Sequence, residues 1–555
     1  VALLTFASVA ISDPLKSEEI SKELSPQSEA VQTEAQRSDA GQMNVNKVEP
    51  VSELVRLVRE GVADVNFSRG LNETELNVVR NFYKSNTKFL WVDETGIKPK
   101  VLKTIAELSN ASDYGLPTKL LSIPVMPVAG AGIQEKALLE LALTRSVLLY
   151  ARFAKGGRIL PSQVGSQLNH VPAVLPAEDI LSSVTEAEDF VQFLRGLHPK
   201  NSQFTQLREK LLELRNANAD QQRVKIPAGP ILRPGISHAQ IALLRQRLQD
   251  IQLSGEQSEL QRYDPELVKK VKAFQTSRGL NADGIIGNGT RKALNGQNPH
   301  KLIKKILMNM ERWRWLPDAL DENTGIYVWA NIPEFRVRII QREKRVFSER
   351  SIVGKVSHKT PVFSDRMEWV EIHPVWYIPN SIKVHDILPS LRRPTSSVMQ
   401  RYNLKVNCGA YGSNYKKINW NTVDIRNCSF TQPPGRASVL GDFKFKFPNK
   451  YSVYMHDTHK PALFRNVRRS YSHGCIRVKQ PRRMAEILLD HDKGMTSKQL
   501  GRILDGPQKP HKEDFNKPVP VHITYFTTYF DDNGNFQTSS DLYGHDRQLA
   551  RVMGL

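Results

Sequence analysis

The spacing of apolar residues changes near residue 301, and this change constrains the fold of the chain more than any other feature. Up to about residue 224, apolar residues recur every three to four positions, as in Leu138–Phe153 and Ile180–Leu197, which predicts amphipathic helices. Beyond residue 301, short runs rich in Val, Ile, Tyr, Phe and Trp, such as Gly325–Ala330, predict β-strands. A chain of 555 residues also exceeds what one hydrophobic core usually supports. We therefore expect a multidomain α+β protein.

Breaks in this pattern divide the predicted domains. A helical scaffold domain is expected over residues 51–225, where no catalytic constellation stands out. Three prolines between positions 227 and 234 mark a linker, and a compact helical module follows within residues 230–297. A mostly-β domain is expected over residues 301–540. Residues 380–436 interrupt it with Asn, Gly, Pro and Ser, and so long an insertion in a β domain is usually functional, such as a lid.

The first fifty residues differ from the rest. Residues 1–12 are uncharged and apolar, with a small-residue pattern typical of the end of a signal peptide; a frayed terminus is the alternative. Residues 13–50 are rich in Ser, Glu, Gln and Ala without apolar periodicity, which predicts a disordered tether. No apolar run approaches the roughly 18 residues that span a bilayer. We expect an exported protein that is located outside the cytoplasm, with no transmembrane segment in the mature chain.

The net charge of +21 restricts the kinds of molecule that the protein is expected to bind. A strongly basic surface suits a polyanion, which could be nucleic acid, anionic lipid or the carboxylate-rich bacterial wall. Basic residues are scattered along the chain, and export would separate the protein from nucleic acid. We therefore expect no nucleic-acid partner.

A cysteine with nearby histidines is the strongest candidate for chemistry. The run Ser472-His473-Gly474-Cys475-Ile476-Arg477 follows His456 after fifteen intervening residues. A thiol must lose its proton before it attacks, and an imidazole can accept that proton. The backbone N–H groups of Gly474 and Cys475 are candidates for an oxyanion hole, where donors face a developing negative charge. These residues predict nucleophilic catalysis by Cys475.

Two other interpretations compete with this one. His456, Asp457, His459 and His473 could be zinc ligands of a wall hydrolase, because His and Asp sets suit zinc with an open position. A metal site would leave the Gly474-Cys475 pair unexplained. The second alternative is a non-enzymatic wall-binding scaffold in which Cys475 is inert.

The helical module carries a motif of its own. Asp264 and Pro265 predict the start of a helix, and residues 283–290 read Asp-Gly-x-x-Gly-x-x-Thr. This order resembles the three-helix peptidoglycan-binding domain. An ordinary helix–turn–helix packing unit is the alternative.

The spacing between His456 and the Cys475 run resembles the signature of L,D-transpeptidases with a YkuD-type catalytic domain. The blocks Asn309–Pro317, Lys359–Ser364 and Leu440–Phe445 resemble the large multidomain Gram-negative YcbB-type murein L,D-transpeptidases. The resemblance implies a mostly-β YkuD-like catalytic domain with an inserted lid.

The resemblance also implies residue roles. Cys475 would be the nucleophile and His456 its general base and acid, with a carbonyl near Asp457 orienting the imidazole. Ser472, Gly474 and Asp457 would belong to the oxyanion site and the surrounding loop. His473 would shape that loop, and Arg477 would hold loop geometry or a substrate carboxylate.

The implied reaction forms 3→3 peptidoglycan cross-links from tetrapeptide donor stems, through a Cys475 thioester with release of D-Ala. The implied partners are stem peptides, glycan and other wall-synthesis proteins, with a role in wall biogenesis and cell shape. The resemblance also implies that the enzyme needs no cofactor and that carbapenems would acylate Cys475. A water acceptor would make the enzyme an L,D-carboxypeptidase, and a lipoprotein lysine would make it a lipoprotein-to-peptidoglycan ligase.

The chain contains three cysteines, Cys408, Cys428 and Cys475. An odd number in an exported protein suggests one bridge and one free thiol. If Cys475 is the working thiol, Cys408 and Cys428 form the only possible internal disulfide; two unpaired surface cysteines are the alternative.

Overall fold

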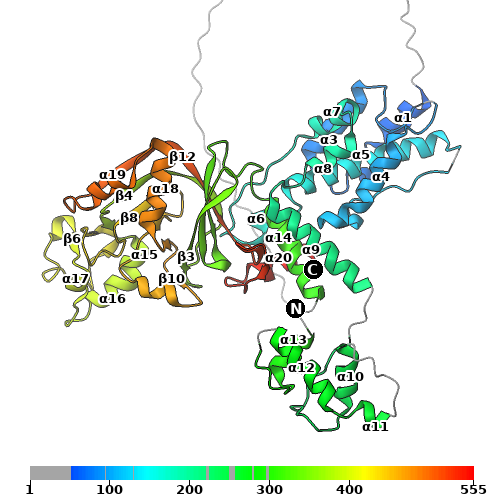
Figure 1. Ribbon diagram of the computed structural model, residues 1–555. Coiled ribbons are helices and arrows are strands. Elements are labelled where there is room, and N and C mark those ends of the chain that lie inside the picture. The colour runs from blue at the N-terminus through cyan, green and yellow to red at the C-terminus, as the bar shows by residue number, and fades with distance from the viewer. Residues whose placement is uncertain are drawn as a thin grey trace, which may run out of the picture. The chain divides into compact units, whose positions relative to one another are not determined.

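The computed structural model describes residues 52–93, 95–128, 130–219, 224–248, 257–277, 280–295 and 299–555 (Figure 1). The expected signal-peptide remnant at 1–12 and the tether at 13–50 lie outside these residues. In the described part of the chain, no helix is both long and apolar enough to cross a membrane.

The N-terminal helical domain is organised around α5 (Ile133–Gly156), most of which is buried. Its other helices are α1 (Glu53–Gly61), α2 (Val65–Ser68), α3 (Glu73–Ser85), α4 (Lys100–Ser109), η1 (Asn110–Tyr114), η2 (Thr118–Leu120), α6 (Pro161–Val164), α7 (Ala177–Glu186), α8 (Phe190–Gly196) and α9 (Ser202–Ala219). The buried carboxylate of Glu140 accepts N–H bonds from Leu90 and Trp91 at 2.7 Å each, which joins α5 to the loop after α3. Trp91 is fully buried, as expected of a core residue.

One helix that the sequence predicts is two separate helices in the structure. The apolar run Ile180–Leu197 is divided between α7 and α8, whose axes are separated by a short break. The break arises because the Asp189 carboxylate accepts a hydrogen bond from the Gln192 N–H at 3.0 Å and so caps a new helix. Apolar spacing persists across the break and hides it.

The second helical module contains α10 (Ala239–Arg247), α11 (Gln257–Leu260), α12 (Pro265–Ser277) and α13 (Asn288–Asn295). The Asp264 side chain accepts a hydrogen bond from the Leu267 N–H at 2.9 Å, so α12 begins where the sequence predicts. Gly284 has a φ of 76°, a conformation that favours glycine, and its N–H binds the buried Gln275 side chain at 2.8 Å. The Asp-Gly turn is thereby fixed between α12 and α13.

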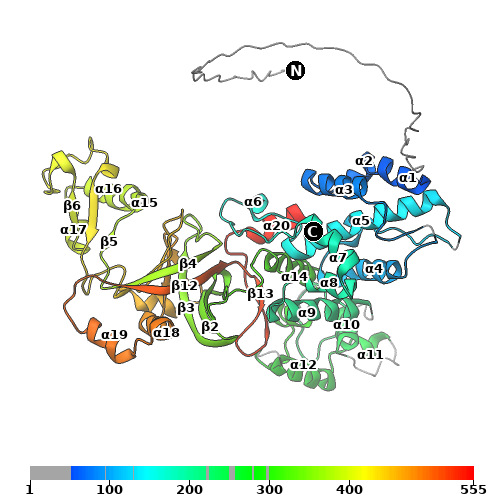
Figure 2. The same cartoon turned by 90° about the horizontal axis from the view of Figure 1, so that it is seen from above.

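Within residues 299–555, all of which are described, nine strands form the main sheet in the order β10-β3-β11-β9-β8-β4-β12-β1-β2. The strands are β1 (Ile326–Asn331), β2 (Arg336–Gln341), β3 (Lys344–Gly354), β4 (Phe363–Ile372), β8 (Phe443–Lys446), β9 (Met455–His456), β10 (Ser470–Ser472), β11 (Ile476–Val478) and β12 (His511–Thr524). Because β3 also pairs with β2, the run from β3 to β2 closes on itself and protects its edges. Figure 2 shows β2, β3, β4 and β12 side by side.

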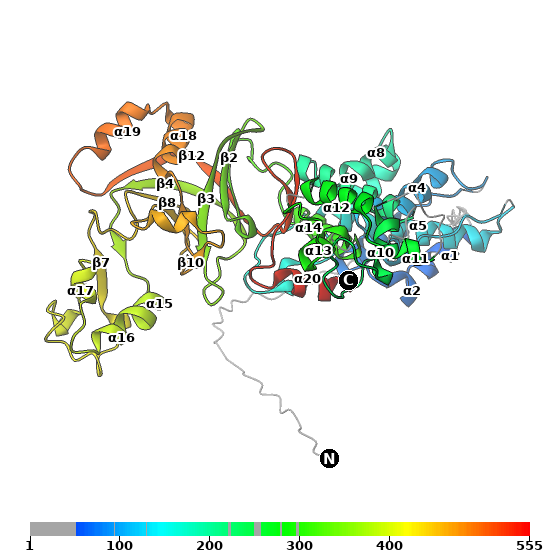
Figure 3. The ribbon, with the colours of Figure 1, turned by 60° about the horizontal axis from the view of Figure 1, so that its bottom comes forward.

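Helices complete this domain, and the first of them contradicts the prediction that β structure begins near residue 301. They are α14 (Pro299–Trp313), η3 (Ile332–Glu334), η7 (Pro461–Arg465), α18 (Pro481–Lys493), α19 (Ser497–Leu504) and α20 (His545–Met553), with a small hairpin of β13 (Thr528–Phe530) and β14 (Phe536–Thr538). Residues 299–313 are thus helical, and β structure begins only at Ile326. Figure 3 shows α18 and α19 beside β12.

The core of the β domain draws residues from beyond its predicted limits. Leu168, from the helical domain, and Leu549, on α20, belong to the same buried cluster as the sheet residues. The Asn169 N–H donates to the Val362 carbonyl at 2.7 Å, which ties the helical domain to the start of β4. The buried core therefore extends past residue 540.

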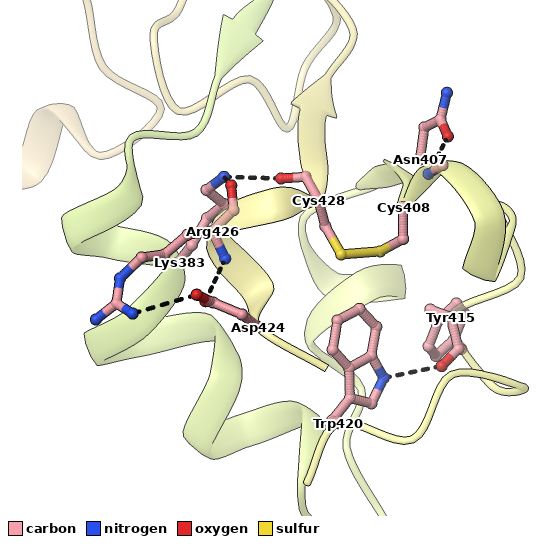
Figure 4. The surroundings of a disulfide bond; sticks show 9 residues. Lys383, Asn407, Cys408, Tyr415, Trp420, Asp424, Arg426 and Cys428 are labelled. Carbon is pink, nitrogen blue, oxygen red and sulfur yellow. Dashed lines mark hydrogen bonds and ion pairs between the residues drawn. A yellow bond between two sulfur atoms is a disulfide. The ribbon is translucent and has the colours of Figure 1, made fainter. Parts of the chain in front are cut away.

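The insertion, here residues 376–440, is a folded unit with an apolar core of its own. It contains β5 (Trp376–Tyr377), α15 (Asn380–Ile382), the π-helix η4 (Lys383–Ile387), α16 (Leu388–Leu391), α17 (Val398–Arg401), β6 (Lys405–Asn407), η5 (Gly409–Tyr411), η6 (Ile425–Asn427) and β7 (Ser429–Gln432). A disulfide joins Cys408 to Cys428, and Lys383 donates to the Cys428 carbonyl at 2.7 Å (Figure 4). The Trp420 indole N–H binds the Tyr415 carbonyl nearby. The role of the insertion as a lid stays a prediction.

Candidate active site

A cavity of about 900 Å³ contains the predicted catalytic residues. The main domain lines it with Lys444, Lys446, Tyr454, His456, His459, Ser472, His473, Cys475 and Arg477. The insertion lines it with residues that include Trp376, Tyr377, Asp386, Ile387 and Tyr402. The apolar core of the insertion also packs against Tyr454 and Cys475. The insertion therefore forms part of the wall around the thiol.

Strand pairing explains how distant residues meet here. β9 and β11 are parallel neighbours, and their register sets His456 opposite Arg477. The Ile476 N–H also donates to the Tyr454 carbonyl at 3.1 Å. Parallel neighbours require a crossover of about a dozen residues or more. The fifteen-residue gap in the sequence is the main part of that crossover, and it brings Cys475 beside the strand that carries His456.

Cys475 is a free thiol and is partly exposed to the cavity. Burial of the sulfur raises the pKa of the Cys475 thiol. The backbone N–H of Tyr454, the charge of Lys446, the hydroxyl of Tyr454 and the charge of Arg477 oppose this rise in pKa. The resting group is therefore a thiol whose deprotonated form has hydrogen-bond donors and cations already in place.

His456 is almost fully buried, with 4% of its surface exposed. Burial, together with the charge of Arg477, lowers the pKa of His456 to about 3, while the Asp457 backbone favours the protonated ring. Nδ1 of His456 has no hydrogen-bond partner among the described residues. The imidazole is thus neutral at physiological pH and available to accept a proton.

The Asp457 carboxylate supports a turn and does not bind the imidazole. It accepts N–H bonds from Asp442 at 3.0 Å and Thr458 at 2.6 Å. A Cβ on Gly441 would lie 2.2 Å from the carboxylate, so glycine is required at that position. This packing explains why the Leu440-Gly441-Asp442 block accompanies His456.

The loop before Cys475 is held by its own hydrogen bonds. The Ser472 hydroxyl accepts the Gly474 N–H at 3.1 Å and donates to the Cys475 carbonyl at 2.5 Å. Gly474 has a φ of 116°, and its carbonyl accepts the Thr360 hydroxyl at 2.7 Å. The structure therefore assigns the Gly474 N–H to loop geometry, unlike the oxyanion role that the sequence suggested. Among the described residues, the Cys475 N–H has no acceptor, so it is the candidate donor.

His473 faces the insertion. Its Nε2 lies 3.0 Å from the Asp386 carboxylate on η4 and 3.3 Å from the Lys355 ammonium. Its ring lies 4.8 Å from the ring of His358, measured between centroids. Burial lowers the pKa of His473, and Asp386 opposes that effect. His473 therefore connects the cysteine loop to the insertion.

Arg477 lies in the cavity wall with few partners. Its Nη1 donates to the Thr458 hydroxyl at 3.4 Å, and its buried Nε has no hydrogen-bond partner among the described residues. Burial lowers the pKa of Arg477, while the thiol of Cys475 opposes this. Its guanidinium thus remains largely available to a ligand.

The four residues considered as zinc ligands do not form a metal site. His473 turns toward Asp386, whereas His456 is buried on β9. In the described part of the chain, no group of three or more His, Cys, Asp or Glu side chains is arranged to hold a metal ion.

Sequence reasoning missed three residues of the site. Tyr454 is two positions before His456, and strand alternation could have placed both on one face. Thr360 and Asp386 reach the cysteine loop from residues more than eighty positions away, so local pattern carries no signal for them.

Comparison with known proteins identifies three regions. A model of the L,D-transpeptidase catalytic domain matches residues 325–504. A scaffold-domain model matches residues 77–211, and a model described as "Putative peptidoglycan binding domain" matches residues 237–294. These matches agree with the predicted order of modules.

A curated relative from Haemophilus influenzae, named "Putative L,D-transpeptidase", is 29% identical over 249 residues. The match covers 45% of this chain and 49% of the relative, so the chain spans about half the length of that protein.

Two solved structures are also similar. An L,D-transpeptidase from Mycobacterium smegmatis is 11% identical, over 36% of this chain and 58% of that one, with a TM-score of 0.19. An L,D-transpeptidase from Xylanimonas cellulosilytica is 13% identical, over 54% of this chain and 99% of that one, with a TM-score of 0.15. The family matches and the predicted modules together identify residues 325–504 as an L,D-transpeptidase catalytic domain of the YkuD type, in a chain that also contains scaffold and peptidoglycan-binding domains.

Proposed function

We propose that this protein is a periplasmic L,D-transpeptidase that forms 3→3 cross-links between peptidoglycan stems through a thioester on Cys475. The observation that carries the proposal is the parallel pairing of β9 with β11, which brings the His456 strand beside a free thiol in a cavity. The match of residues 325–504 to the catalytic domain supports the reaction class. The peptidoglycan-binding module supports the wall as substrate.

In the first half-reaction, His456 accepts the thiol proton and the Cys475 sulfur attacks the carbonyl between diaminopimelate and the terminal D-Ala of a tetrapeptide. A carbon–sulfur bond forms, and the Cys475 N–H donates to the oxyanion. The carbon–nitrogen bond then breaks as the protonated His456 returns its proton to the leaving D-Ala amine. The resting pair is uncharged, because burial raises the pKa of Cys475 and lowers that of His456.

In the second half-reaction, the side-chain amine of diaminopimelate on a neighbouring stem attacks the thioester. His456 accepts a proton from that amine, the carbon–sulfur bond breaks, and the thiol is restored. No ATP is needed, since the thioester retains the free energy of the cleaved amide. A carbapenem, which carries a reactive acyl group, would acylate the same sulfur.

The test is incubation of the full chain with purified disaccharide-tetrapeptides, followed by mass spectrometry. We expect free D-Ala, a transient acyl adduct on Cys475, and 3→3 dimers, with all three lost in Cys475→Ala. Tripeptide without dimers would instead indicate a carboxypeptidase, and transfer only to a lysine-containing lipoprotein would indicate a ligase. No D-Ala and no adduct on Cys475 would refute the enzyme and leave a wall-binding scaffold.

A further inference from the structure

Strand β8 presents two lysines to the catalytic cavity. In the sequence Phe443-Lys444-Phe445-Lys446, the phenylalanines are buried in the core and the lysines alternate to the other face. Both lysines line the cavity. They differ in their partners: Lys444 binds the Glu371 carboxylate at 2.9 Å, whereas Lys446 has no carboxylate within ion-pair distance among the described residues. Lys446 is therefore a half-buried cation without a direct ion pair in the described part of the chain, and Glu371 acts on its charge only from a longer distance.

Lys446 lies close to the reacting sulfur. Its Nζ is 5.5 Å from the ring centroid of Tyr454, a residue whose hydroxyl lowers the pKa of Cys475. Burial and the neighbouring charge of Lys444 lower the pKa of Lys446, and Glu371 and Cys475 act in the opposite direction. A half-buried cation of this kind is stabilised when an anion enters its site.

Arg477 supplies a second cation to the same volume. Its charge, like that of Lys446, acts on the Cys475 sulfur, and its buried Nε lacks a partner among the described residues. The charged residues lining the cavity also include Lys444, Lys460 and Asp386. Asp386, the acidic one, is 3.0 Å from His473. The side of the cavity near the sulfur thus carries more positive than negative charge.

We propose that Lys446 and Arg477 form the binding site for the C-terminal carboxylate of the donor stem peptide. The proposal rests on the function proposed above and adds the residues that select the donor. In a tetrapeptide the carboxylate belongs to the residue that leaves, so it lies one residue from the carbonyl attacked by Cys475. The charges of Lys446 and Arg477 attract this carboxylate and also stabilise the deprotonated sulfur. The two cations thereby align the last peptide bond with the nucleophile.

This site would make the reaction depend on the length of the donor stem peptide. A further residue at the C-terminus moves the carboxylate by up to about 3.6 Å and removes it from the two cations. An amide cap leaves the length unchanged and removes the charge. Charge-assisted hydrogen bonds of this kind are worth about a 10- to 100-fold difference in binding. The enzyme should therefore prefer a free tetrapeptide to its C-terminal amide by about that factor.

The test compares release of D-Ala from the tetrapeptide with release of D-alaninamide from the amidated tetrapeptide. Both rates are measured by mass spectrometry on the full chain, as kcat/KM, for the wild type, Lys446→Gln and Lys446→Arg. Lys450→Gln is the matched control: it removes one charge four positions further on, and Lys450 does not line this cavity.

We expect Lys446→Gln to lose most of the preference for the carboxylate, because its rate should fall much further on the tetrapeptide than on the amide, where only the effect of the charge on Cys475 is lost. Lys446→Arg should restore the preference, and Lys450→Gln should keep it. Equal losses on both substrates in Lys446→Gln, or a wild type that does not distinguish them, would overturn the carboxylate site while leaving the transpeptidase intact. Absence of acylation of wild-type Cys475 by either peptide would overturn the proposed function itself.

Discussion

Thr360 is the residue whose replacement tests most directly how the cysteine loop is held. Its hydroxyl accepts the buried Gly354 N–H at 2.9 Å and donates to the Gly474 carbonyl at 2.7 Å. Thr360→Val keeps the volume of the side chain and removes both bonds. Each buried group left without a partner costs about 1–3 kcal/mol, so we expect the free energy of unfolding to fall by about 2–6 kcal/mol.

The same change should slow the chemistry. Because Gly474 precedes Cys475, release of its carbonyl lets the thiol leave its position, and a shift of about 1 Å can cost about 100-fold in rate. Calorimetry of the full chain measures the stability, and alkylation of Cys475 together with acylation by tetrapeptide measures the site. Thr360→Ser, which keeps the hydroxyl, should remain close to the wild type. A Thr360→Val variant that melts and reacts like the wild type would refute the reasoning.

Three other perturbations have expected outcomes. Tyr454→Phe removes a hydroxyl that lowers the pKa of Cys475, so the pH profile of iodoacetamide alkylation should move to higher pH; an unchanged profile would contradict the contact. Replacing both Cys408 and Cys428 by Ser opens a loop of 20 residues and should lower the stability of the insertion by about 3 kcal/mol. The expected result is faster proteolysis of the insertion than in the wild type at the same temperature. His456 has a folded pKa of about 3, below its ordinary value of 6.5, so the unfolded chain binds more protons between these values. The buried neutral ring therefore contributes its full stabilisation above pH 6.5. As pH falls from 6.5 toward 3, the free energy of unfolding decreases by about 1.4 kcal/mol per pH unit. His456→Gln should therefore lose less stability on acidification than the wild type, and identical acid profiles would count against the buried neutral ring.

Much of the fold follows from short-range pattern. Apolar spacing predicted the helical domain, and Asp264 with Pro265 predicted the start of α12, because capping and periodicity act within one or two turns. Alternation predicted most strands of the main sheet. The pattern failed at Ile180–Leu197, where a cap divides the helix, and at residues 299–313, where a helix precedes the strands.

The sequence by itself located the candidate thiol, the candidate histidine and the spacing between them, which matches the connection that a parallel crossover between β9 and β11 requires. Only the tertiary structure decided which side chains surround them. Tyr454 lowers the pKa of the Cys475 thiol, Thr360 binds the Gly474 carbonyl, and Asp386 lies 3.0 Å from His473. These contacts join segments far apart in the chain, and they depend on burial and strand register, which local sequence does not carry.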